Sequence, residues 1–223
     1  MDGAALAARL KPLNFFSGRL DLDGEAASIR NLYAGLFRGP SLHILVLTLR
    51  CNQACVYCRA SCGGEKRADM SWEIARRSVD LALSSPGPSV TLEFQGGEAL
   101  LNWRVLRRSV VYALEKNRKA GKDLALTVVT NLTLMDREKL EFLASRGVSV
   151  CTSIDGPADL HDANRRKLGG SSHALAGRWL KEFKKRTGGG GRDSLPSALM
   201  TTTRLSLGRE KEIVDEYRRL GLG

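Results

Sequence analysis

The chain has 223 residues, of which 43% are hydrophobic and 26% are charged, and its formal net charge is +11. This length suits one sizeable domain, and the composition excludes a disordered or fibrous chain. No apolar run approaches the roughly 18 residues of a membrane span, and Asp2 precedes the short apolar stretch near the N-terminus, unlike the basic start of a secretory signal. We therefore expect a soluble, cytoplasmic protein with no membrane association.

The excess of positive charge lies mostly in the last quarter of the chain. Residues 1–164 hold 21 basic and 18 acidic residues, whereas residues 165–223 hold 14 and 6. A basic segment attracts nucleic acid or acidic peptides, but a solvated helix face is the commoner explanation. The charge alone therefore does not favour nucleic acid as a partner.

Short runs of apolar, branched residues recur along the chain and predict five strands of the kind that is buried on both faces. The predicted strands are 43–49, 90–94, 124–130, 148–153 and 195–201. The first 40 residues do not fit this pattern. We expect a partly helical lead-in segment over 1–40, followed by one domain over 41–223.

Helices are predicted between these strands. Ser71 is the expected N-cap of a helix that ends before Pro86, and Asp136 is the expected N-cap of a second helix that ends at Gly147. A third helix is expected from about 171 to 187. Strands that alternate with helices predict an α/β fold with a parallel sheet, whose ligand site lies at the carboxyl ends of the strands. Periodicity leaves open whether the sheet is open or closes into a barrel.

The strongest chemical signal directly follows the first predicted strand, where Cys51, Cys55 and Cys58 lie within eight residues. Three thiolates on one loop at a sheet edge indicate one soft metal centre. With Cys62 as a fourth ligand, the site would instead be structural zinc or a closed ferredoxin-like cluster. The spacing argues against this alternative, because the first gap is three residues where the bacterial ferredoxin pattern has two, and no proline follows Cys62. Disulfides are less favoured, because the five cysteines are an odd number.

The pattern C-x3-C-x2-C, with an aromatic residue before the last cysteine, resembles the signature of the radical S-adenosyl-L-methionine (SAM) superfamily. Three further motifs at strand ends resemble elements of that superfamily: QGGE at 95–98, TN at 130–131 and SIDGP at 153–157. The resemblance implies a partial (β/α)6 TIM-like barrel. Only five of its six strands are predicted here, so we expect that the core domain is truncated at its C-terminus.

Within the superfamily, the segments FQGGE and SIDGP resemble those of the maturases that modify peptides and proteins, such as the anaerobic sulfatase-maturating enzymes. The segments LTLRCN and SALMTTTR are similar to those of the radical maturase of the His-Xaa-Ser repeat peptide system. Two features depart from the pattern, because Ala99 replaces the usual proline and no C-terminal cysteine-rich module for auxiliary clusters is present.

The resemblance implies an oxidoreductase-type enzyme whose [4Fe-4S] cluster receives an electron from a cellular one-electron reductant. The cluster would cleave SAM to a 5'-deoxyadenosyl radical, which would start the modification of a peptide or protein substrate. A non-catalytic iron-sulfur or zinc binding module, a remnant of such an enzyme, is the alternative.

The resemblance also implies roles for individual residues. Cys51, Cys55 and Cys58 would be the iron ligands. Tyr57 would pack against the adenine of SAM, and Arg165 would pair with its carboxylate. Asn131 and Leu199 would complete the ribose and adenine walls, and Gly96 and Gly97 would let the backbone approach the methionine moiety. The full set implied to bind the cofactor is Tyr57, Gln95, Gly96, Gly97, Glu98, Asn131, Ser153, Arg165 and Leu199. The resemblance identifies no catalytic residue.

Other interpretations of these residues stand beside the resemblance. The glycine pair is also typical of a plain turn, and Ser153 and Asp155 could cap the next segment. Arg165 could belong to a solvated charge run. We expect His161 to be a structural hydrogen-bonding residue and Cys151 to act as a small hydrophobic residue.

Overall fold

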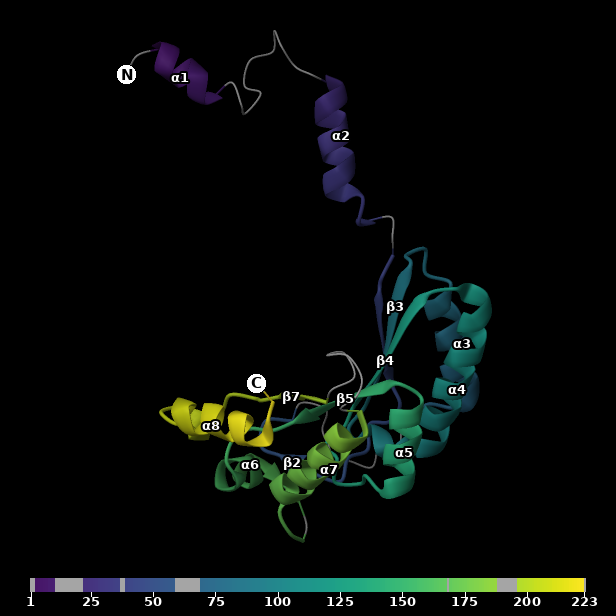
Figure 1. The fold of residues 1–223 in the computed structure, drawn as a ribbon, viewed down its shortest axis with the longest axis vertical. Helices are drawn as coiled ribbons and strands as arrows, with labels where there is room; N and C mark the ends of the chain where they lie inside the picture. Colours follow the sequence, from purple (N-terminus) through teal and green to yellow (C-terminus); the bar gives the residue numbers. More distant parts are fainter. Residues whose placement is uncertain are drawn as a thin grey trace. The chain divides into compact units, whose positions relative to one another are not determined.

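The computed structural model describes residues 3–10, 22–36, 39–58, 69–167, 169–187 and 196–222. Its contacts divide the chain into two compact units, 1–39 and 40–223. The first unit contains helices α1 (Gly3–Leu10) and α2 (Leu22–Tyr33), so the segment before residue 40 is partly helical (Figure 1). All the motifs that carry chemistry lie in the second unit.

A parallel sheet of five strands forms the centre of the second unit, in the order β1-β3-β4-β5-β7. Its strands are β1 (Leu42–Val46), β3 (Ser89–Gln95), β4 (Asp123–Val129), β5 (Val148–Ser153) and β7 (Ser197–Leu199). All five predicted strands are therefore present, and the predicted α/β class with a partial barrel is confirmed. β7 is shorter than predicted, and residue 195, where we expected it to begin, lies outside the described residues.

Helices follow the strands along the chain. They are α3 (Trp72–Leu83), α4 (Trp103–Ala120), α5 (Arg137–Ser145), α6 (Ala158–Asn164), α7 (Ser172–Thr187) and α8 (Glu210–Leu220), with short 3-10 helices η4 (Ala99–Asn102) and η6 (Arg204–Ser206). The two predicted N-caps are confirmed: the Ser71 hydroxyl accepts a hydrogen bond from the Ile74 amide, and the Asp136 carboxylate accepts one from the Lys139 amide. The sequence analysis assigned no helix to the segment of α4.

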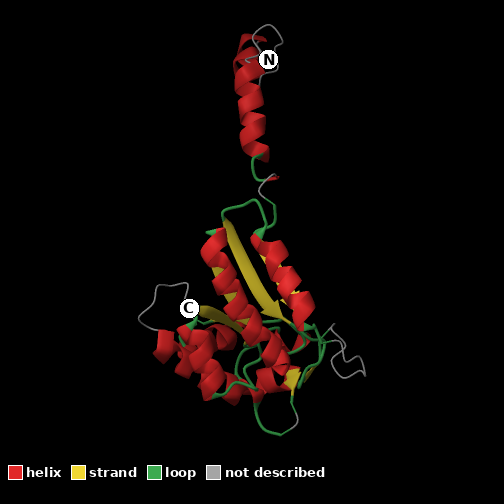
Figure 2. Ribbon diagram, turned by 90° about the vertical axis from the view of Figure 1, so that its right-hand side faces the viewer, coloured by secondary structure: helices red, strands yellow, loops and turns green. Residues whose placement is uncertain are grey.

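One face of the sheet is covered by helices and carries the core. Figure 1 shows α3 and α4 side by side along β3 and β4, and Figure 2 shows these helices in front of the strands. Side chains alternate along β3, so that Val90, Leu92 and Phe94 are fully buried against the helices. Leu106 and Val110 of α4 belong to the same cluster. The apolar face of each helix is thus buried on one side of the sheet.

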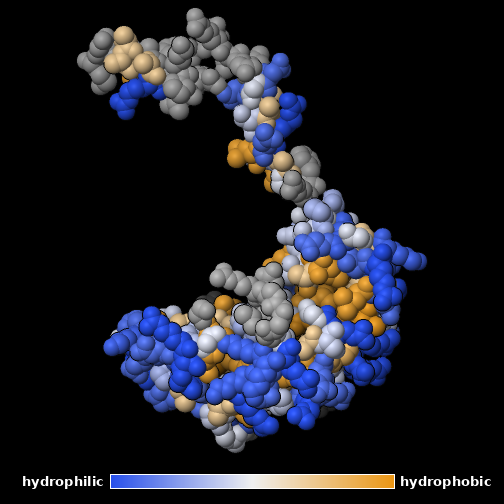
Figure 3. Space-filling model, viewed as in Figure 1, coloured by the Kyte–Doolittle hydropathy of each residue, from blue (hydrophilic) through white to orange (hydrophobic). Residues whose placement is uncertain are grey.

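The other face of the sheet corrects one expectation. The first strand was predicted to be buried on both faces, but Leu42, Ile44 and Val46 are 49%, 50% and 44% exposed. Leu45, between them, is buried on the helix side. β1 is the edge strand of an open partial barrel, so its inward-facing side chains remain accessible, and Figure 3 shows apolar surface in this region.

A second, two-stranded sheet lies outside the main one and was not predicted. β2 (Ala54–Cys55) pairs antiparallel with β6 (Arg165–Arg166), opposing Cys55 to Arg165. The amide of Val56 also donates to the carbonyl of Asn164, at 2.9 Å. The cysteine segment is therefore tied by its backbone to the segment that follows α6. Among the described residues, no helix has the length and hydropathy needed to cross a membrane.

Candidate active site

A cavity of about 140 Å³ lies at the carboxyl ends of the strands, where the parallel topology brings distant loops together. The cysteine segment, the turn after β3, the end of β4, the end of β5 and β6 all contribute to its walls. The lining residues are Cys51, Gln53, Cys55, Tyr57, Cys58, Gly96, Gly97, Val129, Thr130, Asn131, Ser153 and Arg165.

The base of the cysteine segment is fixed by an ion pair. The Arg50 guanidinium donates to both oxygens of Asp69, at 2.9 and 2.6 Å, and the Thr48 hydroxyl donates to Asp69 at 2.6 Å. The hydrogen bond from Arg50 holds the pKa of the Asp69 carboxyl below its usual value. These contacts join the residue that precedes Cys51 to Asp69, which precedes α3.

The three thiols of this segment face the same cavity. The Cys58 amide donates to the Cys55 carbonyl at 3.1 Å, so the second and third cysteines lie on one turn. Burial raises the pKa of the Cys55 thiol, and the nearby Arg165 opposes that shift. In the described part of the chain, no three His, Cys, Asp or Glu side chains gather closely enough to hold one metal ion.

The glycine pair after β3 packs against the backbone that leads into the cysteine segment. The Gly97 amide donates to the Thr48 carbonyl at 2.8 Å. A Cβ on Gly96 would lie under 3.0 Å from the Thr48 carbonyl oxygen, and one on Gly97 equally close to that of Arg50. Glycine is required here because two backbone segments approach directly, which is a reason that the sequence analysis did not give. The pair is therefore more than a plain turn.

A buried carboxylate connects this turn to the end of β4. Glu98 is 1% exposed, and its carboxylate accepts hydrogen bonds from the Thr130 hydroxyl, the Asn131 amide and the Leu100 amide, at 2.7, 2.7 and 3.0 Å. Burial raises its pKa, and these donors oppose the shift. Leu132, the residue after Asn131, has a positive φ of 60°, which is a strained conformation for a residue with a side chain. Glu98 therefore holds a strained turn beside the cavity.

The same turn holds the cysteine segment through an amide pair. The Asn131 side chain donates to the Asn52 side-chain oxygen at 2.9 Å, and Asn52 donates to the Thr133 hydroxyl at 2.7 Å. The Asn131 amide nitrogen also lies 4.0 Å from the Cys51 sulfur. Asn131 thus bridges the end of β4 and the first cysteine.

A second buried carboxylate, that of Asp155, organises the opposite wall. Asp155 has no exposed surface and pairs with the Arg165 guanidinium through Nε at 3.1 Å and Nη2 at 3.3 Å. It accepts the Tyr57 hydroxyl at 2.7 Å and the Thr201 amide at 3.2 Å. The Arg165 guanidinium lies over the Tyr57 ring, 5.3 Å from its centre, and burial raises the pKa of the Tyr57 hydroxyl. One carboxylate therefore orients two lining side chains and joins β5, β6 and β7.

Nine of the twelve residues that the resemblance implied line this one cavity. The other three do not. Gln95 donates its side-chain amide to Glu93, Glu98 lies behind the wall, and Leu199 on β7 is 64% exposed. The contacts of all twelve residues with a cofactor stay predictions.

Besides the nine implied residues, Gln53, Val129 and Thr130 also line the cavity. The sequence analysis gave no role to Gln53 and missed the supporting role of Asp155. Gln53 is 5% exposed, lines the cavity, and its side-chain nitrogen has no hydrogen-bond partner among the described residues. Its place between the first two cysteines is a signal that could have pointed to it. Asp155 was considered only as a cap, although its position two residues beyond β5 places it at the ligand edge.

The contacts of single residues distinguish between the remaining interpretations. Arg165 is only 9% exposed and pairs with Asp155, so it does not belong to a solvated run. The His161 ring nitrogen Nδ1 accepts the Asp155 amide at 3.2 Å, which confirms its structural hydrogen-bonding role. Cys151 is buried within β5, as expected of a small hydrophobic residue. Cys62 lies outside the described residues.

The fold and the cavity together define a class of protein, a partial (β/α) barrel with a three-cysteine segment at the carboxyl edge of its sheet. Comparison with known families gives the same result. Residues 45–189, more than half of the chain, match the radical SAM superfamily. The chain belongs to this superfamily, whose cofactors are SAM and a [4Fe-4S] cluster.

Individual relatives are similar over part of their length. The serine-type anaerobic sulfatase-maturating enzyme of Bacteroides thetaiotaomicron is 30% identical over 142 residues, 60% of this chain and 34% of that protein. The Fe-coproporphyrin III synthase of Methanosarcina barkeri is 35% identical over 133 residues, 59% of this chain and 31% of that protein. The chain thus spans about a third of the length of these two relatives.

A solved structure shares the fold. The structure of anSMEcpe with bound AdoMet and Kp18Cys peptide superposes with a TM-score of 0.70 at 22% identity. The match covers 81% of this chain and 48% of that one. The open sheet with its helices on one face is therefore a fold that this chain shares with an AdoMet-bound protein.

The residues around the cavity fit these cofactors. In a multi-iron cluster each thiolate binds a different iron, so three thiols that line one cavity suit such a cluster. The unpartnered amide nitrogen of Gln53 lies in the same wall. Because a buried donor without a partner is unfavourable, the Gln53 amide nitrogen indicates that a bound group supplies an acceptor at the wall of the cavity.

Proposed function

We propose that this chain is the core of a radical SAM enzyme that modifies a peptide or protein. Cys51, Cys55 and Cys58 would hold a [4Fe-4S] cluster, and SAM would bind in the adjoining part of the cavity. The observation that carries the proposal is the convergence of nine motif residues, from five separate segments, on one cavity. Superfamily membership supports it independently.

The chemistry belongs to the cofactors, which when bound supply an electron and a 5'-deoxyadenosyl radical that abstracts a hydrogen atom from the substrate. The protein's part is to hold and orient them. Asn131 would donate to the thiolate of Cys51, and such hydrogen bonds to cluster sulfurs tune the reduction potential. The tie between Asn131 and Asn52 keeps that donor in place.

Arg165 is suited to bind the carboxylate of the methionine moiety. A guanidinium has five N–H donors, and the contacts with Asp155 use Nε and Nη2, which leaves the Nη1 donors for a ligand. The stacking of Arg165 over Tyr57 further restricts its orientation. Asp155 therefore acts as a positioning residue for both side chains.

The proposed substrate class rests on similarity to sulfatase-maturating enzymes and on the segments that resemble the His-Xaa-Ser maturase. Similarity to a synthase of Fe-coproporphyrin III gives a competing substrate class, a tetrapyrrole. We favour a peptide because maturases of this kind recur among the relatives and the solved structures. A short peptide encoded beside this chain, with His-Xaa-Ser repeats, would identify the substrate.

Electron paramagnetic resonance (EPR) tests the proposal. Protein reconstituted anaerobically and reduced with dithionite is expected to give a cluster signal that changes when SAM is added. No change in the signal, together with no deoxyadenosine formed, would contradict the enzymatic function and leave a binding module.

Cysteine variants distinguish a cluster held by Cys51, Cys55 and Cys58 from a site that also uses Cys62 as a ligand. Cys55→Ala is expected to abolish the cluster signal, and Cys62→Ala is expected to preserve it. Equal loss in both variants would favour a closed, four-ligand site and contradict the proposal.

A further inference from the structure

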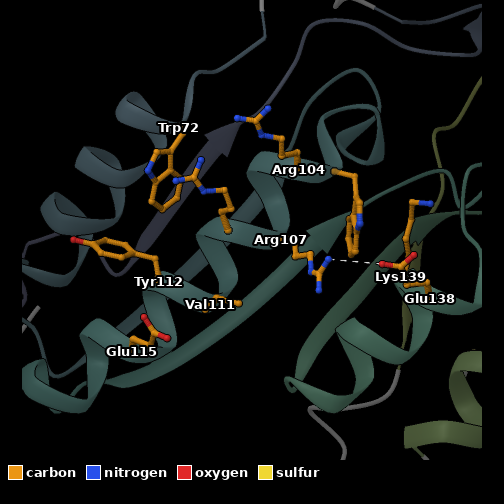
Figure 4. A pocket seen from close by; sticks show the side chains of 10 residues that line it. Trp72, Arg104, Arg107, Val111, Tyr112, Glu115, Glu138 and Lys139 are labelled. Atoms are coloured by element: carbon orange, nitrogen blue, oxygen red, sulfur yellow. Dashed lines mark ion pairs between the residues drawn. The ribbon is translucent and has the colours of Figure 1, made fainter.

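A groove of about 590 Å³ lies on the outer, helical face and is lined by side chains of α3, α4 and α5. Figure 4 shows Trp72 and Tyr112 on one side of it and Glu138 and Lys139 on the other, with Arg104, Arg107 and Val111 of α4 between them. We call this the helical groove. None of its lining residues lines the cysteine cavity.

The floor of the helical groove is built from aromatic rings that are held in place. Trp72 and Tyr112 pack edge to face with their centres 5.7 Å apart, and Trp103 packs in the same way on Phe142, at 5.4 Å. Trp72, Trp103 and Tyr112 are each partly exposed. Rigid aromatic side chains of this kind supply contact area at little entropic loss, which is why Trp and Tyr are enriched at binding hot spots.

Two arginines of α4 line the groove without a carboxylate at ion-pair distance among the described residues. Arg104 and Arg108 are four residues apart on α4, so their side chains emerge on one face of the helix, about 5–6 Å apart at Cβ. The Arg108 guanidinium stacks on the Trp72 ring, 4.1 Å from its centre. Among the described residues, no ion pair within 4.0 Å joins either arginine to a carboxylate. The nearby Glu73 carboxyl has a pKa that is lowered mainly by hydrogen bonds, first from its own backbone, and in smaller part by the charge of Arg108. A stacked guanidinium that lacks a direct ion pair is oriented in advance for bidentate binding of a carboxylate.

The charge of the groove indicates the chemistry of its partner. Four basic residues line it: Arg104, Arg107 and Arg108 of α4 and Lys139 of α5. The acidic residues Glu115 and Glu138 also line the groove, and Arg107 pairs with Glu138 at 3.8 Å. Glu115 and Glu138 would repel the phosphates of a nucleic acid that runs along the groove. The separate carboxylates of an acidic peptide can be placed away from these two side chains.

We propose that the helical groove is a docking site for an acidic polypeptide segment. Two carboxylates of that segment would pair with Arg104 and Arg108, and an apolar side chain would lie on the aromatic floor over Val111. The proposal does not depend on the cofactors, because the groove and the cysteine cavity share no residue.

The tryptophans make the test direct, since the chain has three and two of them line the groove. In the anaerobically purified 223-residue chain, the indole N–H resonances of Trp72 and Trp103 report the groove, and that of Trp179 on α7 serves as an internal reference. The probe is a capped octapeptide of alternating glutamate and leucine. A peptide with glutamine in place of glutamate and a single-stranded oligothymidylate are its controls.

We expect a saturable shift of the Trp72 and Trp103 resonances with the acidic peptide, and no shift of Trp179. The glutamine peptide should bind about tenfold more weakly, which corresponds to about 1.4 kcal/mol. Equal binding of the two peptides, an equal shift of all three resonances, or binding of the oligothymidylate alone would overturn the proposal.

A matched pair of variants locates the contact. Arg108→Ala should weaken binding of the acidic peptide about fivefold or more, because it removes a charge-assisted, stacked donor. Arg178→Ala removes an arginine that stacks in the same way on Trp179, outside the groove, and should leave the affinity unchanged. If Arg108→Ala does not fold, loss of wild-type binding on raising the salt concentration supplies the electrostatic test. Equal effects of the two variants, or binding that salt leaves unchanged, would contradict the proposal.

Discussion

The cysteine cavity and the helical groove differ in almost every property that could identify a functional site. The groove, at about 590 Å³, is several times larger than the cavity, at about 140 Å³, and has the richer aromatic lining. The cavity instead collects side chains from five segments far apart in the sequence, with fully buried charges behind its wall. The chemistry of the cavity is therefore indicated by lining residues that come from distant segments and by the buried charged groups that hold them. The size of the groove indicates only that a partner has room to bind.

The largest expected effect concerns the thiols that distinguish the cavity. Cys51→Ala, Cys55→Ala or Cys58→Ala should each reduce the iron of the reconstituted chain from about four atoms to fewer than one, because three ligands are the minimum for such a cluster. Iron and sulfide analysis measures this. Cys151→Ala, which removes a thiol buried in β5, is the matched control and should retain the iron. Equal loss in the control would mean that the segment is not the cluster site.

The next effect contrasts the buried ion pair of the cavity with the exposed pair of the groove. Asp155→Ala leaves the Arg165 guanidinium buried without its partner and should lower the free energy of unfolding by about 3–5 kcal/mol. Glu138→Ala removes the exposed partner of Arg107 and should leave stability unchanged. Urea unfolding measures both. Similar effects of the two variants would contradict the contrast between these regions.

The dependence of stability on pH gives a further contrast, because the groove contains no histidine. Burial lowers the pKa of His161 from 6.5 to about 4, so the folded chain binds fewer protons than the unfolded chain between these values. The stability from neutral His161 is therefore complete above pH 6.5 and is lost as the pH falls toward 4, by about 2–3 kcal/mol at pH 4.5.

Urea unfolding at pH 7 and pH 4.5 measures this loss. His161→Gln can still accept the Asp155 amide but does not titrate, so its loss between the two pH values should be smaller than that of the wild type. An identical pH dependence of the two proteins would contradict the assignment.

A smaller effect tests the close backbone approach at the cavity. Gly97→Ala should lower the free energy of unfolding by about 1–3 kcal/mol, because its Cβ would displace the backbone of Arg50. It should also weaken SAM binding. Gly177→Ala in α7 is the control: its Cβ would lie 3.6 Å from a Leu220 methyl carbon, and alanine should stabilise the helix by up to about 1 kcal/mol. Calorimetric titration with SAM measures binding, and urea unfolding measures stability. Unchanged stability and unchanged SAM binding in Gly97→Ala would contradict the close approach as the reason for this glycine.

Much of the sheet was predictable, because each strand is a short apolar run bounded by turn residues, and two helices begin at side-chain caps. α4 was missed, since its first residue follows a 3-10 turn and Asn102 gives no side-chain cap. The face of β1 that remains open was also missed, because periodicity shows which side chains share a face and not what covers it. Burial of that face depends on the closure of the barrel, which is a property of the whole fold.

The residues of the candidate site that belong to local sequence motifs were predictable. Nine implied residues line the cavity because parallel strands bring their carboxyl ends to one edge. The roles of Asp155 and Gln53 depend on contacts across about 100 residues or on a buried atom without a partner, and neither leaves a spacing pattern. The reason for Gly96 and Gly97 was likewise a tertiary contact, the approach of the backbone at Thr48 and Arg50.

The central claim, that the cysteine cavity binds and cleaves SAM, is tested most directly by measuring 5'-deoxyadenosine after anaerobic reduction in the presence of SAM. The account predicts that the wild-type chain forms deoxyadenosine well above the level without protein. It also predicts that Cys55→Ala forms none and that Cys151→Ala forms as much as the wild type. Deoxyadenosine formation that survives Cys55→Ala, or its absence from a wild-type chain that holds a full complement of iron, would contradict the claim.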